Sequence, residues 1–186
     1  MFDLNQDQPP DWMRFTETRH VSWREVQAMA RRHAPQISGE HDLLVAIMRA
    51  GSPVAALLAQ QTGLPIDYLI CSRRNPDPCF LDGEARAPRG RRILLVDDAC
   101  GSGWTFARCR EYCERLGNQV GTFSVFRCAA PGMFVPDFSM GADPGTYLRW
   151  PWEYQRESEM PAVQACGSAG TAGLSASRAS SIVSSL

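Results

Sequence analysis

Unbroken apolar runs and helical spacings of apolar residues alternate along this chain. Residues 43–48 and 93–96 are continuous apolar runs, as expected for strands that are buried on both faces of a sheet. Between these runs, apolar residues recur at helical spacing in residues 54–62. Strands that alternate with helices favour an α/β fold, in which helices flank a mostly parallel central sheet.

Local signals place the remaining elements. Ser22 and Glu25 form a capping-box pattern that begins a helix. That helix should stop before Pro35, because proline has no amide hydrogen to donate within a helix. A third helix over residues 105–116 should end at Gly117. Further extended segments are predicted for residues 15–21, 65–71, 119–127 and 146–150.

One connection is unusually long for a domain of this size. Residues 72–91 form an irregular stretch that contains three prolines, two glycines and five arginines. Such long segments in compact domains are often lids or binding segments. We therefore predict that residues 72–91 form a small mobile hood that orders over a bound ligand.

The two ends of the chain differ in composition from its middle. Residues 1–14 are polar and contain prolines, so we predict a flexible arm. Residues 161–186 are rich in Gly, Ala and Ser and cannot bury enough apolar surface to offset the entropy of ordering. We predict a disordered tail there and a single domain over residues 15–160.

Length and charge exclude several classes of protein. A chain of 186 residues fits one domain and can bury a core without disulfides or a structural metal. Its formal net charge of -1 argues against an electrostatic nucleic-acid binder. No stretch reaches the roughly 20 apolar residues of a membrane span, and the N-terminus has no apolar signal-peptide core. We expect a cytoplasmic protein that binds neither nucleic acid nor membrane.

The basic residues restrict the chemistry of any anion site. All 19 are arginines, so such a site must use arginine, backbone N–H groups or a metal, and a lysine Schiff base is impossible. The seven cysteines form no CxxC pair and are expected to be reduced and mostly buried. Cys109 and Cys113 share a predicted helix face, but no further ligand nearby completes a structural zinc site.

Residues 93–105, with the sequence ILLVDDACGSGWT, concentrate the candidate chemistry. The apolar strand delivers Asp97 and Asp98 to the carboxyl edge of the sheet, where ligands bind in open α/β folds. The next residues open a helix, so backbone N–H groups and the helix dipole favour a phosphate. Carboxylates for sugar hydroxyls beside such a loop indicate a sugar-phosphate site. The loop residues are Ala99, Cys100, Gly101, Ser102, Gly103, Trp104 and Thr105.

Other interpretations of this segment fit less well. Response-regulator receiver domains also carry an acidic pair at a strand end, but near the N-terminus and together with a distal lysine, which this chain lacks. A Walker loop would need GK[ST], which is absent. Strand-end aspartates without a functional role remain the alternative.

Residues 93–105 resemble the signature of type I phosphoribosyltransferases, in which two acids and a small-residue loop bind phosphoribosyl pyrophosphate (PRPP). DLLVAIMRAGSPVAALLAQQTGLP (residues 42–65) resembles the strand, pyrophosphate-binding loop and helix that precede this signature. HVSWREVQAMA (residues 20–30) and TYLRWPWEYQ (residues 146–155) are similar to the opening and the PWE or PWD ending of short bacterial and archaeal hypoxanthine and xanthine-guanine phosphoribosyltransferases. The similarity spans residues 19–154.

The resemblance implies a role for each part of the signature. Asp97 and Asp98 would hold the ribose hydroxyls of PRPP. Residues 99–105 would wrap the 5′-phosphate, through backbone amides and the hydroxyls of Ser102 and Thr105. Mg2+ would bind the pyrophosphate and ribose oxygens, with the two aspartates assisting indirectly.

The resemblance also implies a pyrophosphate site. Residues Arg49, Ala50 and Gly51 would form its loop, where the family often has a cis peptide bond. Arg73 and Arg74, at the start of the predicted hood, are either further pyrophosphate contacts or solvated surface residues. The predicted catalytic residues are accordingly Asp97, Asp98 and Arg49.

The aromatic ending provides candidates for base recognition. Tyr147 lies where the family places the aromatic residue that stacks on the base, and Trp150 and Trp152 are nearby alternatives. Glu153 would position this segment or contact the ligand through water. Ordinary core packing is the competing explanation for the aromatic residues.

The implied reaction is displacement of pyrophosphate from C1 of the ribose by a ring nitrogen of a purine-type base, as in purine salvage. Gly101 departs from the 6-oxopurine enzymes, in which an Asp at this position handles the N7 proton. Orotate- and adenine-specific relatives also lack that acid, whereas the PWE-type ending favours purines. These two features conflict, so the sequence leaves the acceptor open.

Two further functions stay open. The chain could be a regulator that keeps the fold and senses PRPP or a nucleotide with little turnover. It could also be a phosphoribosyltransferase for a different acceptor. In either case we expect a homodimer or homotetramer.

Overall fold

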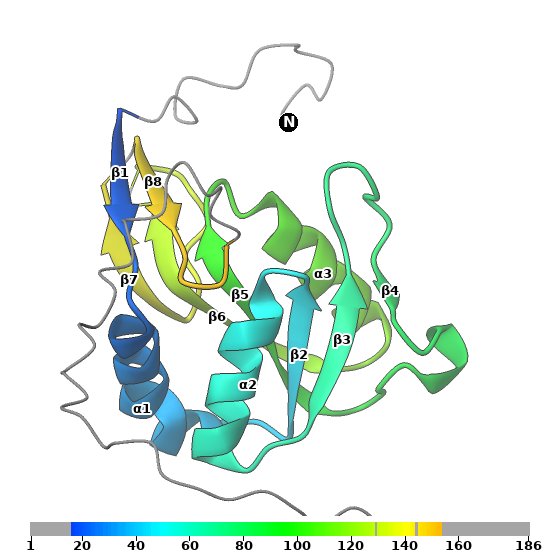
Figure 1. The fold of residues 1–186 in the computed structure, drawn as a ribbon. Helices are drawn as coiled ribbons and strands as arrows, with labels where there is room; N and C mark the ends of the chain where they lie inside the picture. Colours follow the sequence, from blue (N-terminus) through cyan, green and yellow to red (C-terminus); the bar gives the residue numbers. More distant parts are fainter. Residues whose placement is uncertain (1–15, 129, 144, 154–186) are drawn as a thin grey trace, which may run out of the picture. The chain divides into compact units, whose positions relative to one another are not determined.

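The computed structural model describes residues 16–153, apart from residues 129 and 144 (Figure 1). The chain divides into two units after Glu153, and the second, Tyr154–Leu186, lies outside the described residues. The predicted arm over residues 1–14 and the predicted tail over residues 161–186 also lie outside them.

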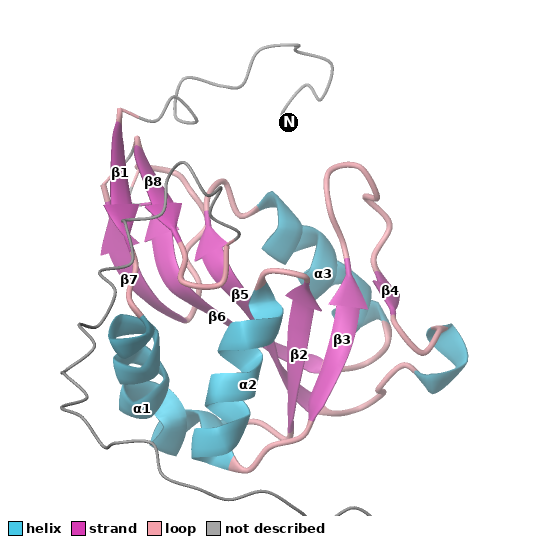
Figure 2. Ribbon diagram, in the orientation of Figure 1, coloured by secondary structure: helices cyan, strands magenta, loops and turns pink. Residues whose placement is uncertain are grey.

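A six-stranded sheet forms the centre of the described unit, in the order β4-β3-β2-β5-β6-β7 (Figure 2). All neighbouring strands are parallel except β3 and β4. The α/β fold with a mostly parallel sheet is therefore confirmed. The strands are β2 Leu43–Met48, β3 Ile66–Ile70, β4 Cys79–Phe80, β5 Arg92–Cys100, β6 Gln119–Cys128 and β7 Phe138–Ala142.

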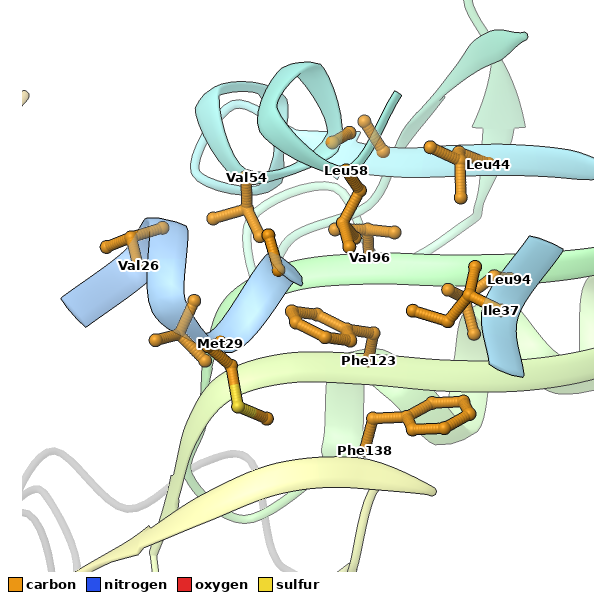
Figure 3. Close-up of a cluster of buried hydrophobic side chains, with 14 of the residues drawn as sticks. Val26, Met29, Ile37, Leu44, Val54, Leu58, Leu94, Val96, Phe123 and Phe138 are labelled. Carbon is orange, nitrogen blue, oxygen red and sulfur yellow. The ribbon is translucent and has the colours of Figure 1, made fainter. Parts of the chain in front are cut away.

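Helices cover both faces of this sheet. The first two, α1 (Trp23–Glu40) and α2 (Gly51–Thr62), pack on one face, and Figure 3 shows their shared core, in which Leu44 lies among helix residues. The third, α3 (Trp104–Arg115), packs on the opposite face with Val45. Successive side chains of a strand point to opposite faces of the sheet. Both faces of β2 are therefore buried, since helices cover each of them. Within the described ranges, no helix has the length and apolarity needed to cross a membrane.

Helix α1 does not stop before Pro35, so that prediction is wrong. The helix continues to Glu40 with Pro35 in its interior. An interior proline costs a helix about 3 kcal/mol. The continuation buries Ile37 completely in the core beneath α1, and burying such a side chain contributes about 1.5–3 kcal/mol. Tertiary packing therefore offsets most of the local penalty.

A separate pair of parallel strands joins the two ends of the described chain. It consists of β1 (Glu17–His20) and β8 (Thr146–Arg149). The sequence predicts both strands but misses β7, a five-residue strand that contains Ser and Gly. Residues 72–91 are less irregular than predicted, since they include β4 and a short 3-10 helix, Glu84–Arg86.

Candidate functional site

The acidic pair lies within strand β5. This strand runs through to Cys100, two residues beyond the acidic pair at which the predicted strand ends, because β6 pairs with it up to Arg127. The connecting loop is correspondingly short and consists of residues 101–103. Asp98 is buried, at 9% exposed, whereas Asp97 is half-buried.

The two aspartates face different surroundings. Asp97 lines a cavity and lies near the thiol of Cys71. Asp98 instead lies near Glu153, whose charge raises the pKa of Asp98, and near Tyr147, whose pKa is raised chiefly by burial and further by the charge of Asp98. Each carboxylate accepts a hydrogen bond from the next backbone amide, at 2.9 Å for Asp97 and 2.6 Å for Asp98. Of the two carboxylates, only that of Asp97 therefore lines this cavity.

Burial sets the protonation of this pair. Desolvation raises the pKa of Asp98 to about 6, and the nearby Glu153 carboxylate adds to the rise. Desolvation also raises the pKa of Asp97 well above its usual range, with a further rise from the negative charge of Asp98. Buried neighbouring carboxylates favour a cationic ligand, which would restore their ionised form.

A cavity of about 190 Å³ brings the predicted phosphate loop together with Asp97 and Arg73. Its wall also includes Phe106 of α3. Both predicted hood arginines are exposed, but Arg74 lies outside this lining. The lining residues are Arg73, Asp97, Ala99, Cys100, Gly101, Ser102, Gly103, Trp104, Thr105 and Phe106.

The end of the loop is also the start of a helix. Gly103 is the N-cap of α3 and has a φ of 78°, a conformation that glycine adopts at little cost. The Trp104 amide donates to Ser102 Oγ at 3.3 Å, which fixes the hydroxyl at the mouth of the helix. Free N–H groups and the dipole at a helix N-terminus favour a bound anion.

The predicted pyrophosphate loop lies beside the acidic strand. The Met48–Arg49 peptide bond is cis, as the resemblance implies. Arg49 and Ala50 are exposed, while Gly51 packs so closely against Val96 that a Cβ would overlap its carbonyl oxygen. These loop residues do not line the 190 Å³ cavity but reach the same edge of the sheet.

The aromatic residues after β7 divide into surface and core. Tyr147 is 37% exposed, and its hydroxyl donates to Glu153 Oε1 at 3.3 Å. The other carboxylate oxygen, Glu153 Oε2, accepts from the Trp150 amide at 3.1 Å. Trp150 is only 4% exposed and stacks on Trp152 with ring centroids 5.0 Å apart. Core packing thus accounts for Trp150, and a direct contact of Trp150 with a base stays a prediction.

Trp152 lies between two other indoles. It stacks on Trp150 and approaches Trp23 of α1, with ring centroids 5.3 Å apart. One aromatic residue of the site carried no signal in the sequence: Phe134, between β6 and β7, packs behind the phosphate loop.

Comparisons with known proteins agree with this geometry. A family model described as a phosphoribosyl transferase domain matches residues 18–131. No curated protein matches the sequence significantly.

Three solved structures show the same fold. A purine phosphoribosyltransferase from Pyrococcus horikoshii Ot3 superposes with a TM-score of 0.64 at 18% identity, over 76% of this chain and 97% of that one. A hypothetical protein from Neisseria gonorrhoeae with bound ppGpp gives 0.62 at 17% identity, over 77% and 93%. The xanthine-guanine-hypoxanthine phosphoribosyltransferase of Helicobacter pylori gives 0.56 at 17% identity, over 74% and 94%.

Proposed function

Since this chain belongs to the phosphoribosyl transferase domain family, we propose that it transfers ribose 5-phosphate from PRPP to a purine-type base and releases pyrophosphate. The observation that carries the proposal is the cavity that joins Asp97 to the phosphate loop. A carboxylate for ribose hydroxyls and backbone amides for a phosphate are the two recognition elements that ribose 5-phosphate needs.

The reaction breaks the bond from C1 of the ribose to the pyrophosphate oxygen, which leaves with the electron pair. A ring nitrogen of the base forms the new bond to C1. The chain contributes positioning and charge. Asp97 and Asp98 orient the sugar, and Arg73 and Arg49 neutralise phosphate oxygens, with little covalent chemistry left to the protein.

Magnesium fits the donor set at this edge. Carboxylate oxygens are ligands that Mg2+ accepts, and a cation would offset the burial that raises the pKa values of Asp97 and Asp98. Bound there, Mg2+ would neutralise charge on the pyrophosphate. The aspartates would hold it directly or through water, while the substrate would supply further oxygens.

Base recognition is assigned to Tyr147, whose ring is partly exposed and whose hydroxyl is fixed by Glu153. An aromatic ring can stack on any nucleobase, so Tyr147 supports a nucleobase acceptor without selecting a particular base. The Pyrococcus and Helicobacter structures, both named as enzymes that act on purines, support the purine class.

A pyrophosphate-release screen tests the proposal. Wild-type protein is incubated with PRPP, Mg2+ and a panel of purine and pyrimidine bases, and the Asp97→Asn/Asp98→Asn variant serves as the control. We expect release that depends on one base and is lost in the variant. Release with none of the bases, or equal release by the variant, would contradict the enzyme assignment.

A second candidate is a PRPP- or nucleotide-sensing protein. Gly101 has no side chain that could accept a proton from the base, and the similar Neisseria structure holds ppGpp. Calorimetry with PRPP and with ppGpp separates the two candidates. Tight binding without turnover on any base favours the sensor, whereas base-dependent turnover favours the enzyme.

A further inference from the structure

Phe134 occupies the space that the absent side chain of Gly103 leaves open. A Cβ on Gly103 would overlap the Cβ and the ring of Phe134. Gly103 also has a positive φ of 78°, which L side chains rarely adopt. Position 103 is therefore restricted to glycine by Phe134 as well as by its own backbone.

The same aromatic residue contacts both sides of the phosphate loop. Its ring stacks parallel to Phe106 of α3, with centroids 5.7 Å apart, and Phe106 is 1% exposed and lines the cavity. Its carbonyl oxygen accepts from the thiol of Cys100, at the end of β5, at 3.9 Å. Phe134 thus bridges the strand before the loop and the helix after it.

A polar network holds Phe134 in place. The Arg110 guanidinium lies 5.4 Å from its ring centroid and donates to Asp137 Oδ2 at 3.2 Å. Asp137 in turn accepts from the amide and the hydroxyl of Thr122, both at 2.8 Å. Thr122 is fully buried in β6. The segment that carries Phe134 is therefore tied to the central sheet and to α3.

We propose that Phe134 is a positioning residue for the phosphate subsite. It holds the backbone of residues 101–103 in the shape that presents their N–H groups to the 5′-phosphate of PRPP. Donors that are already in place lose less entropy when the ligand binds. The proposal deepens the proposed function and rests on it.

Calorimetry with two half-ligands tests the proposal. Ribose 5-phosphate probes the phosphate loop, and magnesium pyrophosphate probes the separate loop at Arg49. In Phe134→Ala we expect about a tenfold loss of affinity for ribose 5-phosphate and an affinity for magnesium pyrophosphate within about twofold of wild type. Val135→Ala, which truncates the 60% exposed neighbour, is the matched control and should leave both affinities unchanged.

Two more variants keep the test decisive. Phe134→Leu keeps the bulk against Gly103 but loses the ring stack, so we expect about a three- to fivefold loss of ribose 5-phosphate affinity. Phe134→Tyr keeps the stack and should stay within about twofold of wild type. Unchanged ribose 5-phosphate affinity in the Leu and Ala variants, or equal loss for both ligands, overturns the proposal.

A ligand-independent measurement separates this proposal from the proposed function. In the free protein, the Trp104 amide donates to Ser102 Oγ, and the Ala107 amide donates to the Gly103 carbonyl oxygen. Their hydrogen exchange should be at least about tenfold faster in Phe134→Ala, with amides of β2 unchanged. Unchanged exchange at both positions contradicts the positioning role. Faster exchange in a protein that binds no PRPP supports the positioning role and contradicts only the proposed function.

Discussion

Gly51 and Val96 are packed backbone against backbone: a Cβ on Gly51 would overlap the carbonyl oxygen of Val96. This contact joins the N-terminus of α2 to the strand that carries the acidic pair, since Val96 directly precedes Asp97. The predicted pyrophosphate loop and the predicted ribose site are therefore held at a fixed spacing by a contact that only glycine allows.

Gly51→Ala should destabilise the protein. Overpacking at a rigid backbone contact costs about 1–3 kcal/mol, so the free energy of unfolding in urea should fall by that amount. Gly39→Ala is the matched control, because position 39 of α1 has open space and alanine favours a helix by up to about 1 kcal/mol. Equal stability of the Gly51 variant and wild type would contradict the packing argument.

Replacing both aspartates should weaken PRPP binding. Charge-assisted hydrogen bonds contribute about 1.5–3 kcal/mol each, so calorimetry on Asp97→Asn/Asp98→Asn should show well over a tenfold loss of affinity. Glu114→Gln, an exposed acid of α3, tests for a general charge effect and should bind PRPP normally. If the double variant keeps its affinity, the ribose assignment is wrong.

The two hood arginines should differ. Arg73 lines the cavity and Arg74 does not. Loss of a hydrogen bond to a charged group costs about 1.5–3 kcal/mol, so Arg73→Ala should bind PRPP at least about tenfold more weakly. Arg74→Ala should stay within about threefold of wild type, because Arg74 lies outside the cavity lining and an exposed charge contributes only about 0–1 kcal/mol. Similar PRPP affinities in the two variants would show that a position in the cavity lining does not decide which arginine contacts PRPP.

Asp98 should make the stability of the free protein depend on pH. Its folded-state pKa of about 6 lies above the ordinary aspartate value of 3.8, so between these values the folded state holds a proton that the unfolded state has released. The contribution of Asp98 is therefore present below about pH 4 and is lost as the pH rises through about 6. Urea denaturation over this range should show a loss of stability that is roughly 2–3 kcal/mol smaller in Asp98→Asn, in which the raised pKa of Asp97 accounts for the remaining pH dependence. Identical slopes in wild type and variant would refute the assignment.

Gly101→Asp should raise turnover if the acceptor is a 6-oxopurine. A positioned carboxylate contributes about 10²- to 10⁴-fold to proton transfer, and wild-type turnover should be correspondingly slow. Gly101 is not among the described glycines with positive φ, so its backbone dihedral imposes no penalty of that kind on a side chain. Steady-state kinetics with hypoxanthine and guanine measures the change, and PRPP calorimetry checks that the phosphate loop is intact. Fast wild-type turnover that the substitution does not alter would mean that another group takes the proton.

The sequence alone determined the features that depend on local patterns. The apolar runs that form β2 and β5 predicted buried parallel strands, because a strand covered on both faces has no side chains facing solvent. Asp97 and Asp98 follow one of these runs, so their place at the sheet edge also followed from the sequence. The capping box at Ser22 and Glu25 is local too, and the structure contains it.

Only the tertiary structure decided the features that depend on distant contacts. Pro35 remains inside α1 because Ile37, two residues later, is buried beneath the helix. Trp150 is buried in the core because it packs against Trp152 and Phe126. Neighbouring residues reveal none of these partners.

The same reason explains the remaining differences at the site. The sequence does not distinguish the adjacent arginines Arg73 and Arg74. Only the course of the backbone after β3 places Arg73, and not Arg74, in the cavity lining. Phe134 lies 31 positions from Gly103, and no motif connects the two residues. The hydrophobic periods of helices and strands can be recognised from neighbouring residues. The packing of individual side chains is decided only when segments far apart in the chain come together.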